Sequence, residues 1–397
     1  MKIAHIIRRF VFSEWGGTEQ VVWQSAVRQE RLGASADIVA TSALSVSGSE
    51  QVAGIGVYRF NYVYPYWPLN RQTRLTLDKK GGNPYSSGLL RHLADGGYDI
   101  MALHCSGRLA QGVIRRCGRC PVVITLHGGA SAVPAGELAQ MLAPLKWKIP
   151  YGGVWDRVRG MAFDPVSRAD AVVCVSREEE NGLKRLYPGR RVVYIPNGVD
   201  TAHFRMRSGL SIRERYNIPD NRRLLLSVAR IDYQKNQKLL VELLSCTDDT
   251  HLLLIGPITS GRYYRELLLL GNELGVMDRL TIIPGVPHND ELLPAALQQS
   301  DIFILPSLHE PFGISALEAW AAGIPVLAST AGGLKDFIRD GENGLQFDPS
   351  SISSLLSAYS RVDREGASLV KRAALDVMDY DWDAVVAKQL ALYRSLM

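Results

Sequence analysis

Short apolar segments alternate with longer amphipathic segments along the whole chain. The short segments are rich in Val, Ile and Leu without strict alternation, which is typical of strands buried on both faces of a parallel sheet. They form two series. The predicted strands are Ile3–Ile7, Ile38–Thr41, Ile100–Leu103, Val122–Leu126, Ala171–Val175 and Val192–Ile195, followed by Leu224–Ala229, Leu252–Ile255, Thr281–Ile283, Ile302–Leu305 and Val326–Ala328. Helical spacing predicts helices over Glu19–Leu32, Asn236–Leu244 and Phe312–Ala322.

This alternation of strands and helices predicts the α/β class, with two doubly wound parallel sheets. The two series are separated by a cluster of helix- and strand-breaking residues, Pro196-Asn197-Gly198-Val199-Asp200. We therefore expect one domain over residues 1–195 and a second over residues 196–379. The last segment has apolar residues at helical spacing and predicts a helix over about residues 380–397 that packs back on the first domain.

Composition and charge narrow the class of protein. Hydrophobic residues make up 46% of the 397 residues and charged residues 21%, which is typical of a folded globular chain. No apolar run approaches the roughly 18 residues of a membrane-spanning helix. The first residues, MKIAHIIRRF, predict a strand and not an export signal, so we expect a cytoplasmic protein. Residues 1–191 have an excess of Lys and Arg, whereas the remainder has an excess of Asp and Glu.

The five cysteines give no metal site. Their odd number in a chain without an export signal favours reduced thiols. Cys117 and Cys120 form a single C-x-x-C, and neither a second pair nor histidines follow at the spacing of a structural zinc site.

Two glycines follow the first predicted strand. Gly16 and Gly17 precede the helix that starts near Thr18, where backbone N–H groups can approach a phosphate. A Gly-Gly pair is more often only a turn. The dinucleotide-binding pattern G-x-G-x-x-G is absent.

Cations follow the first strand of the second series. The segment SVARIDYQKN ends a strand and opens a helix, and it places Arg230 and Lys235 at the carboxyl edge of the sheet. Ligands of open α/β sheets bind at that edge, and two cations there suit a diphosphate. Each alone can equally be an ordinary surface cation.

The segment from Glu310 to Glu318, EPFGISALE, is the most informative part of the chain. A turn shaped by Pro and Gly follows a buried strand, and Glu318 lies about one and a half turns into the next helix. The N–H groups of Phe312, Gly313 and Ile314 can bind sugar hydroxyls or phosphate oxygens. The carboxylate of Glu318 can accept hydrogen bonds from vicinal hydroxyls, such as those of a ribose.

Two histidines end neighbouring predicted strands. His104 follows Ile100–Leu103, and His127 follows Val122–Leu126 and precedes Gly128-Gly129. Histidines at the carboxyl ends of strands face the ligand-binding edge of the sheet. A histidine with a purely structural role is the commoner outcome, so the pair favours function only modestly.

Taken together, these segments resemble the retaining glycosyltransferases of family 4, which have the GT-B fold: two facing Rossmann-like domains with a cleft between them. The resemblance covers nearly the whole chain and is strongest from Ile195 to Pro349. It rests on the segments PNGVD, SVARIDYQKN, Glu310-x7-Glu318, EAWAAGIPV, Gly332-Gly333 and DGENG. One departure is Asp336, where relatives often carry Glu.

The resemblance implies a role for each of these residues. Arg230 and Lys235, helped by Gly16 and Gly17, would hold the donor diphosphate. Glu318 would hold the ribose. Glu310 would be catalytic together with His127, and with the backbone of Phe312, Gly313 and Ile314 it would hold the transferred sugar.

The implied activity is hexosyl transfer from a nucleoside-diphosphate sugar, such as a UDP or GDP sugar, with retention of anomeric configuration. The family usually uses no metal ion and no cofactor, because cations and helix dipoles neutralise the leaving diphosphate. The implied course is front-face attack, with the leaving phosphate taking the acceptor proton. The acceptor would be a glycan or lipid-linked glycan in polysaccharide biosynthesis, bound by the first domain, and we expect no nucleic-acid partner.

Other activities remain alternatives. A nucleotide-sugar epimerase of the same fold is the closest, since only product analysis with donor alone distinguishes it. A phosphorylase lacks support because no lysine motif for pyridoxal phosphate stands out, and a dinucleotide-dependent oxidoreductase lacks its glycine pattern. A silent sugar-nucleotide-binding module would not need to keep Glu310, Arg230, Lys235 and His127 together.

Two segments of the first domain combine aromatic and basic residues. These are residues 142–159, LAPLKWKIPYGGVWDRVR, and residues 60–68, FNYVYPYWP, which lead into Arg71 and Arg74. Such residues suit weak contact with an anionic membrane on the inner face of the plasma membrane, or stacking on an oligosaccharide. Core packing with a solvated basic rim is an equal interpretation.

Overall fold

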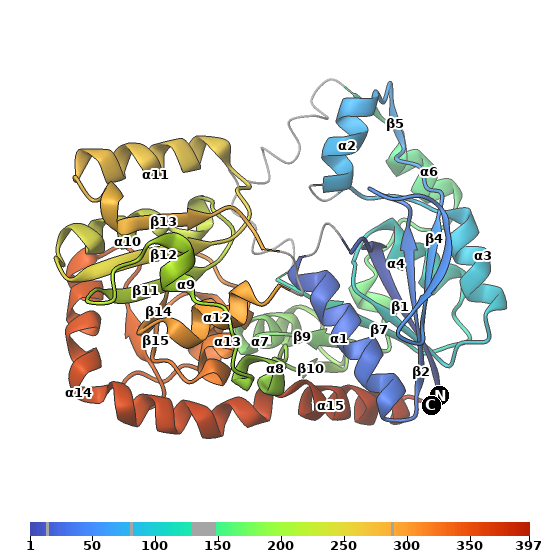
Figure 1. Cartoon of the computed structure of the whole chain (residues 1–397). Coiled ribbons are helices and arrows are strands. Elements are labelled where there is room, and N and C mark those ends of the chain that lie inside the picture. Colours follow the sequence, from blue (N-terminus) through green and yellow to red (C-terminus); the bar gives the residue numbers. More distant parts are fainter. Residues whose placement is uncertain (13–15, 80–81, 129–147, 287–289) are drawn as a thin grey trace. The chain divides into compact units, whose positions relative to one another are not determined.

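The chain forms two compact units. In the computed structural model, which describes residues 1–12, 16–79, 82–128, 148–286 and 290–397, the first unit comprises Met1–Pro196 and Val386–Met397. The second comprises Asn197–Val385 (Figure 1). The division after Pro196 lies one residue from the expected join. The last helix, α15 (Trp382–Arg394), begins in the second unit and ends in the first.

The first unit is built on an eight-stranded sheet in the order β10-β9-β7-β6-β1-β2-β4-β3. Neighbouring strands are parallel except β3, which pairs antiparallel with β4. A separate two-stranded ribbon pairs β5 (Tyr66–Trp67) with β8 (Ile149–Pro150). The strands of the large sheet are β1 (Lys2–Arg9), β2 (Ser35–Thr41), β3 (Gly48–Val52), β4 (Ile55–Phe60), β6 (Ile100–Leu103), β7 (Val122–Leu126), β9 (Ala171–Cys174) and β10 (Val192–Tyr194).

Helices connect these strands. They are α1 (Gly17–Arg31), α2 (Arg71–Lys79), α3 (Ser87–Asp95), α4 (Arg108–Arg116), α6 (Gly152–Val158) and α7 (Arg177–Leu186), with a 3-10 turn η3 (Val166–Arg168). The sequence prediction missed β3 and β4. For β3 the reason is exposure, because this edge strand of Gly, Ser, Glu and Gln has nearly every side chain exposed and carries no apolar signal. Exposure does not account for β4, whose first three residues are buried.

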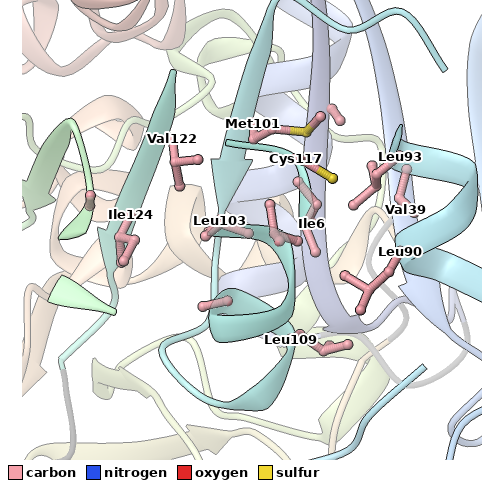
Figure 2. Packing of buried hydrophobic residues seen from close by; sticks show 14 of the residues in the cluster. Ile6, Val39, Leu90, Leu93, Met101, Leu103, Leu109, Cys117, Val122 and Ile124 are labelled. Atoms are coloured by element: carbon pink, nitrogen blue, oxygen red, sulfur yellow. The ribbon is translucent and has the colours of Figure 1, made fainter. Parts of the chain in front are cut away.

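The core of the first unit lies between the sheet and the helices on one face. Figure 2 shows Ile6 of β1 with Met101 and Leu103 of β6, packed against Leu90 of α3 and Leu109 of α4. These side chains are at most 2% exposed. A second apolar cluster covers the other face of the sheet beneath α1, so the strands are buried on both faces.

The second unit has a six-stranded, fully parallel sheet in the order β13-β12-β11-β14-β15-β16. Its strands are β11 (Arg223–Val228), β12 (Thr250–Ile255), β13 (Leu280–Ile283), β14 (Ile302–Leu305), β15 (Val326–Ser329) and β16 (Leu345–Phe347). Its helices are α8 (Thr201–Arg205), α9 (Ile212–Tyr216), α10 (Gln237–Ser245), α11 (Gly261–Glu273), α12 (Leu292–Gln299), α13 (Ile314–Ala322) and α14 (Ile352–Asp376), with 3-10 turns η4 (Tyr233–Lys235), η5 (Met277–Arg279), η6 (Gly332–Asp336) and η7 (Val377–Tyr380).

Each sheet reverses its winding direction once. In the second unit β11 and β14 are neighbours, although β12 and β13 lie between them in the chain. In the first unit β1 and β6 are neighbours in the same way. Ligands of such sheets bind beyond the carboxyl ends of the strands at this point of reversal, because the two connecting helices diverge there. The topology therefore directs attention to the segments that follow β11, β14, β1 and β6.

Within the described ranges, none of the helices combines the length and the apolar character that crossing a bilayer requires.

Candidate active site

The segment after β11 is fixed by Asp232. The carboxylate of Asp232 accepts hydrogen bonds from the backbone N–H of Gln234 (3.0 Å) and the hydroxyl of Thr259 (2.9 Å). It also forms an ion pair with Arg230, with 3.0 Å from Nη1 to Oδ2. The Arg230 side chain is still 45% exposed. Its guanidinium is therefore held in place at the sheet edge while it remains accessible to an anion.

Lys235 and Glu310 meet at the reversal point of the second sheet. Lys235 ends η4 after β11, and Glu310 follows β14. Nζ of Lys235 lies 2.7 Å from Oε2 of Glu310, and both side chains are only 11% exposed. The hydroxyl of Ser307 donates to the same carboxylate oxygen at 3.2 Å. Because the pair is buried, solvent screens its charges only weakly. Removing either partner leaves the other charge buried and uncompensated.

The turn that joins Glu310 to α13 requires glycine at three positions. Gly313 caps α13 with φ of 100°, in the left-handed region. Gly332 and Gly333 pack against the turn, and the N–H of Gly333 donates to the carbonyl of Glu310 at 2.9 Å. A Cβ atom on Gly332 would lie 2.2 Å from that carbonyl oxygen. The first turn of α13 is thereby held with its N–H groups, including that of Ile314, directed beyond the sheet edge.

Glu318 lies on α13 with a buried carboxyl group. Burial raises the pKa of Glu318 from 4.5 to about 7. Burial is the single cause of this shift, and among the described residues no charged or hydrogen-bonding neighbour offsets it. A buried carboxyl group with a raised pKa is a common feature of binding sites.

In the first unit, Gly16 is the N-cap of α1, and no side-chain hydrogen bond caps this helix. A Cβ atom on Gly17 would have no described atom within 4 Å, whereas one on Gly16 would lie 2.8 Å from Oε2 of Glu19. Arg9 at the end of β1 forms an ion pair with Glu19 of α1, with 3.3 Å between Nε and Oε1. The helix N-terminus thus follows β1 at the reversal point of the first sheet.

His127 is the end of a hydrogen-bonded row of three histidines. Its Nε2 lies 2.9 Å from Nδ1 of His104, whose Nε2 lies 3.0 Å from Nδ1 of His5 on β1. Ring centroids are 5.2 Å apart at both steps. Burial lowers the pKa values of His5 and His127 from 6.5 to about 4. The pKa of His104 is lowered well below 6.5, by burial first and then by its two histidine neighbours. All three rings are therefore neutral at pH 7.

Comparison with known proteins decides the family. Residues 15–203 match the model described as Glycosyltransferase Family 4, and residues 210–366 match Glycosyl transferases group 1. A D-inositol 3-phosphate glycosyltransferase of Xylanimonas cellulosilytica is 31% identical over 328 residues, which cover 78% of this chain and 75% of that protein. The chain belongs to glycosyltransferase family 4. A second D-inositol 3-phosphate glycosyltransferase, from Mycolicibacterium smegmatis, is 28% identical over 96% of this chain and 87% of its own length.

Solved structures show the same fold for this glycosyltransferase. Sucrose-phosphate synthase from Thermosynechococcus elongatus matches with a TM-score of 0.74 and 22% identity, over 100% of this chain and 98% of that one. HepE from Anabaena, in complex with UDP and glucose, matches with a TM-score of 0.72 and 19% identity over the whole of both chains. The expected GT-B fold, with its two Rossmann-like domains, is confirmed.

The structure of the glycosyltransferase brings some predicted site residues together. Lys235 is bonded to Glu310, whereas Arg230 is bonded to Asp232 instead. Phe312, Gly313, Ile314 and Glu318 follow Glu310 on the same turn and helix. His127, Gly16 and Gly17 belong to the other unit. Within the described residues, no group of three His, Cys, Asp or Glu side chains is arranged to hold a metal ion.

The two aromatic and basic segments divide in the structure. Leu142, Leu145, Lys146 and Trp147 lie outside the described residues. Tyr62 and Tyr64 are buried, and both hydroxyls donate to Asp78, at 2.6 and 2.9 Å. These two rings are core residues, so of the open interpretations core packing holds for them. Exposed apolar side chains remain at Trp67, Ile149, Tyr151, Val154 and Val158, which we term the exposed corner.

Sequence reasoning missed the residues that contact the predicted site residues and hold them in place. Asp232 and Ser307 hold Arg230 and Glu310, and His5 continues the histidine row. The available signal was weak but real: His5 is a polar residue inside an otherwise apolar strand, IAHII, where an unpaired ring would be costly.

Proposed function

We propose that this enzyme is a retaining glycosyltransferase that moves a hexose from a nucleoside-diphosphate sugar to a hydroxyl group of a glycan or lipid-linked glycan. The observation that carries the proposal is the buried Lys235–Glu310 pair, set where the second sheet reverses and beside the N-terminus of α13. Family membership gives the reaction class, and this site gives charges of the right sign for a diphosphate sugar.

The second unit is the donor-binding domain in this proposal. Lys235 and Arg230 hold the diphosphate, since both cations follow the same strand and α13 adds the positive end of its dipole. Gly16 and Gly17 of the first unit support the same phosphates through backbone N–H groups. Glu310 and the N–H groups of Phe312, Gly313 and Ile314 orient the sugar. Glu318 accepts hydrogen bonds from the ribose. Complexes of HepE with UDP and with UDP-glucose make a UDP sugar the first donor to test, with GDP sugars second.

The reaction breaks the bond between the anomeric carbon and the β-phosphate oxygen. The acceptor oxygen attacks from the face that the diphosphate leaves, and the acceptor proton passes to the departing phosphate oxygen. Lys235 and Arg230 stabilise the negative charge that develops there. His127 lies beside the sugar ring, where a neutral imidazole tolerates the positive charge that develops on the ring. This course retains the anomeric configuration.

We further propose that no metal ion is required, because Arg230, Lys235 and the α13 dipole neutralise the diphosphate. A thermal-shift screen of nucleotide sugars identifies the donor, since a ligand at 100 times its dissociation constant adds about 2.7 kcal/mol of stability. Transfer by the enzyme should then continue in excess chelator. Loss of activity that Mg²⁺ or Mn²⁺ restores would contradict this role of the cations. Conversion of the donor in the absence of any acceptor would instead identify an epimerase.

The first unit binds the acceptor in this proposal. The D-inositol 3-phosphate glycosyltransferases carry a phosphorylated polyol in their name, which makes inositol phosphate the first soluble acceptor to test. Lipid-linked glycans on the cytoplasmic side of the plasma membrane form the second group. The excess of Lys and Arg in residues 1–191 favours an anionic partner of either kind.

The exposed corner supports weak contact with an anionic membrane. Trp67 and Ile149 face each other across the β5–β8 ribbon and are 66% and 62% exposed, and Val154 and Val158 are exposed one turn apart on α6. The exposed cations Arg71 and Arg157 flank them. Apolar side chains beside cations suit the headgroup region of anionic lipid.

Liposome sedimentation at low salt tests this contact. The enzyme should bind vesicles with phosphatidylserine several-fold better than neutral vesicles, and the double change Trp67→Ser with Ile149→Ser should remove most of the binding. Leu269→Ser, at an equally exposed position in the second unit, is the matched control. Equal binding to both vesicle types would leave the soluble acceptors as the only candidates.

A further inference from the structure

The histidine row continues past His5 to the last helix of the chain. Nε2 of His5 lies 2.7 Å from Oε1 of Gln29 on α1. Nε2 of Gln29 donates to Oε1 of Gln389 on α15 at 3.2 Å, and Nε2 of Gln389 donates to the hydroxyl of Ser25 at 3.3 Å. From His127 to Gln389 the row therefore joins five uncharged side chains from β1, α1, α15 and the ends of β6 and β7. All belong to the first unit.

Hydrogen-bond chemistry gives this row a direction. Gln29 uses its amide N–H toward Gln389, so only its carbonyl oxygen faces His5, and Nε2 of His5 must carry the proton. A neutral imidazole has one N–H, so Nδ1 of His5 accepts a hydrogen bond from Nε2–H of His104. By the same rule Nδ1 of His104 accepts from Nε2–H of His127. The terminal atom of the row, Nδ1 of His127, is left with a lone pair.

The same rule means that all hydrogen bonds of the row must reverse together. If Gln389 presented an N–H to Gln29 in place of its carbonyl oxygen, the amide of Gln29 would turn and every imidazole would exchange its donor and acceptor nitrogens. His127 would then present Nδ1–H in place of a lone pair. A change at Gln389, four hydrogen bonds from His127, would thus convert the terminal atom from an acceptor into a donor.

We propose that Gln389 and Gln29 are positioning residues that fix His127 as the Nε2–H tautomer, so that its Nδ1 offers a lone pair to a hydroxyl group of the transferred sugar. This inference rests on the proposed function, which places His127 beside the donor sugar. A lone pair there favours the positive charge that develops on the sugar ring in the transition state, whereas an N–H group would oppose it. No proton moves along the row, because Gln29 cannot take one up.

The test is spectroscopic, with two variants that carry charge at the same position. Gln389→Glu can only accept from Gln29 and should keep the direction of the row. Gln389→Lys can only donate and should reverse it. Enzyme with ¹⁵N-labelled histidine is examined by long-range ¹H–¹⁵N correlation at pH 8, and the signals of His127 are assigned by their loss in His127→Gln.

We expect an unprotonated Nδ1 on His127 in the wild type and in Gln389→Glu, and a protonated Nδ1 in Gln389→Lys. The kcat of Gln389→Lys should fall on the order of ten- to a hundredfold with little change in the KM for donor, while Gln389→Glu stays closer to the wild type. A purely structural role would make the two charged variants equally defective. Gln24→Leu, on α1 with Gln29 but outside the row, is the control for both readouts.

Each failure has a separate meaning. A protonated Nδ1 on His127 in the wild type, or the same tautomer in both variants, overturns the inference whatever the activity. If the tautomer reverses as expected but kcat does not change, the row is directional and the proposed place of His127 beside the sugar is wrong. Should Gln389→Lys fail to fold, Gln29→Leu replaces it: this variant removes the acceptor for His5, and a mixture of His127 tautomers is then expected, while a single Nε2–H tautomer would contradict the inference.

Discussion

The two units place different chemistry at the same topological position. Where the second sheet reverses, the side chains are charged: Lys235 meets Glu310, and Arg230 meets Asp232. Where the first sheet reverses, Arg9 and Glu19 also form an ion pair, but the side chains that link β1, β6 and β7 are neutral at pH 7: His104 follows β6 and bonds to His5 on β1 and to His127 after β7. One fold thus supplies a buried charged pair in one unit, which we term the charged edge, and a row of neutral rings in the other.

This difference indicates how work is divided between the units. A diphosphate needs fixed positive charge, and buried charges are stable only with partners. In the second unit, the segments that carry such charges pack closely against Gly332 and Gly333, which holds them in place. A reacting sugar needs oriented hydrogen bonds without net charge, which a row of neutral rings provides. The comparison predicts that substitutions in the second unit act mainly through charge, and those in the first unit mainly through hydrogen-bond direction.

The largest effect is expected at the charged edge. Lys235→Ala and Glu310→Ala should each reduce kcat on the order of 10²–10³-fold, because each removes a contact to developing charge and leaves its partner unpaired. Steady-state kinetics with the donor found by the screen measures the loss. Circular dichroism and thermal melting establish that the variants fold.

A matched pair of charges provides the control. Lys238 of α10 and Glu266 of α11 are also 2.7 Å apart, but their side chains are 33% and 29% exposed. Lys238→Ala and Glu266→Ala should leave kcat within about twofold, because exposed pairs contribute little. Equal losses in both pairs would mean that the buried pair acts only on stability, and the charged-edge account would be wrong.

An intermediate effect is expected at Glu318. Ribose hydroxyls that donate to its carboxylate should lower the raised pKa of Glu318, so that nucleotide binding near pH 7 releases protons. Glu318→Gln should weaken nucleotide binding roughly tenfold and abolish the proton release. Isothermal titration calorimetry of UDP and GDP in two buffers of different ionisation enthalpy measures both quantities. Proton uptake by the wild type would contradict the assignment of Glu318 to the ribose.

The smallest effect separates the stabilities of the two units in acid. The pKa values of His5 and His127 are lower in the folded state, at about 4, than the 6.5 of an unfolded chain. Stability of the first unit is therefore lost as pH falls from about 6.5 to about 4. His251, also with a pKa lowered to about 4, acts in the same sense in the second unit. Glu318 acts in the opposite sense there, since its pKa of about 7 gives stability as pH falls from 7 to 4.5.

Hydrogen exchange with mass spectrometry resolves this difference by region. After correction for intrinsic rates, peptides from β1 and β6 should lose more protection between pH 7 and pH 5 than peptides from β11 and β14. The variant Glu318→Gln should narrow the gap, because it removes the compensating group of the second unit. Equal losses in wild-type units would show that the histidine row is not kept neutral by burial.

The sequence allowed the second unit to be predicted more fully than the first, for physical reasons. Carboxylates in a turn-rich segment such as EPFGISALE have few purely structural roles, so the sequence alone indicates Glu310 and Glu318 as site residues. His5, Gln29 and Gln389 come from three separate parts of the chain, and only the fold brings them into a row. The strand β3 was missed because an exposed edge gives no apolar pattern. For Tyr62 and Tyr64 the sequence left surface and core equally open, and the fold decides for the core, where Asp78 satisfies their hydroxyls.

The central claim is that the charged edge holds a nucleotide sugar whose leaving phosphate accepts the proton of an acceptor attacking from the same face. The most direct test is ¹H NMR of the freshly formed product, recorded before any spontaneous anomerisation, with an α-linked donor and an acceptor hydroxyl. The account predicts an α-linked product from the wild type in the presence of chelator. A β-linked product would contradict it, because inversion requires a general base on the opposite face of the sugar.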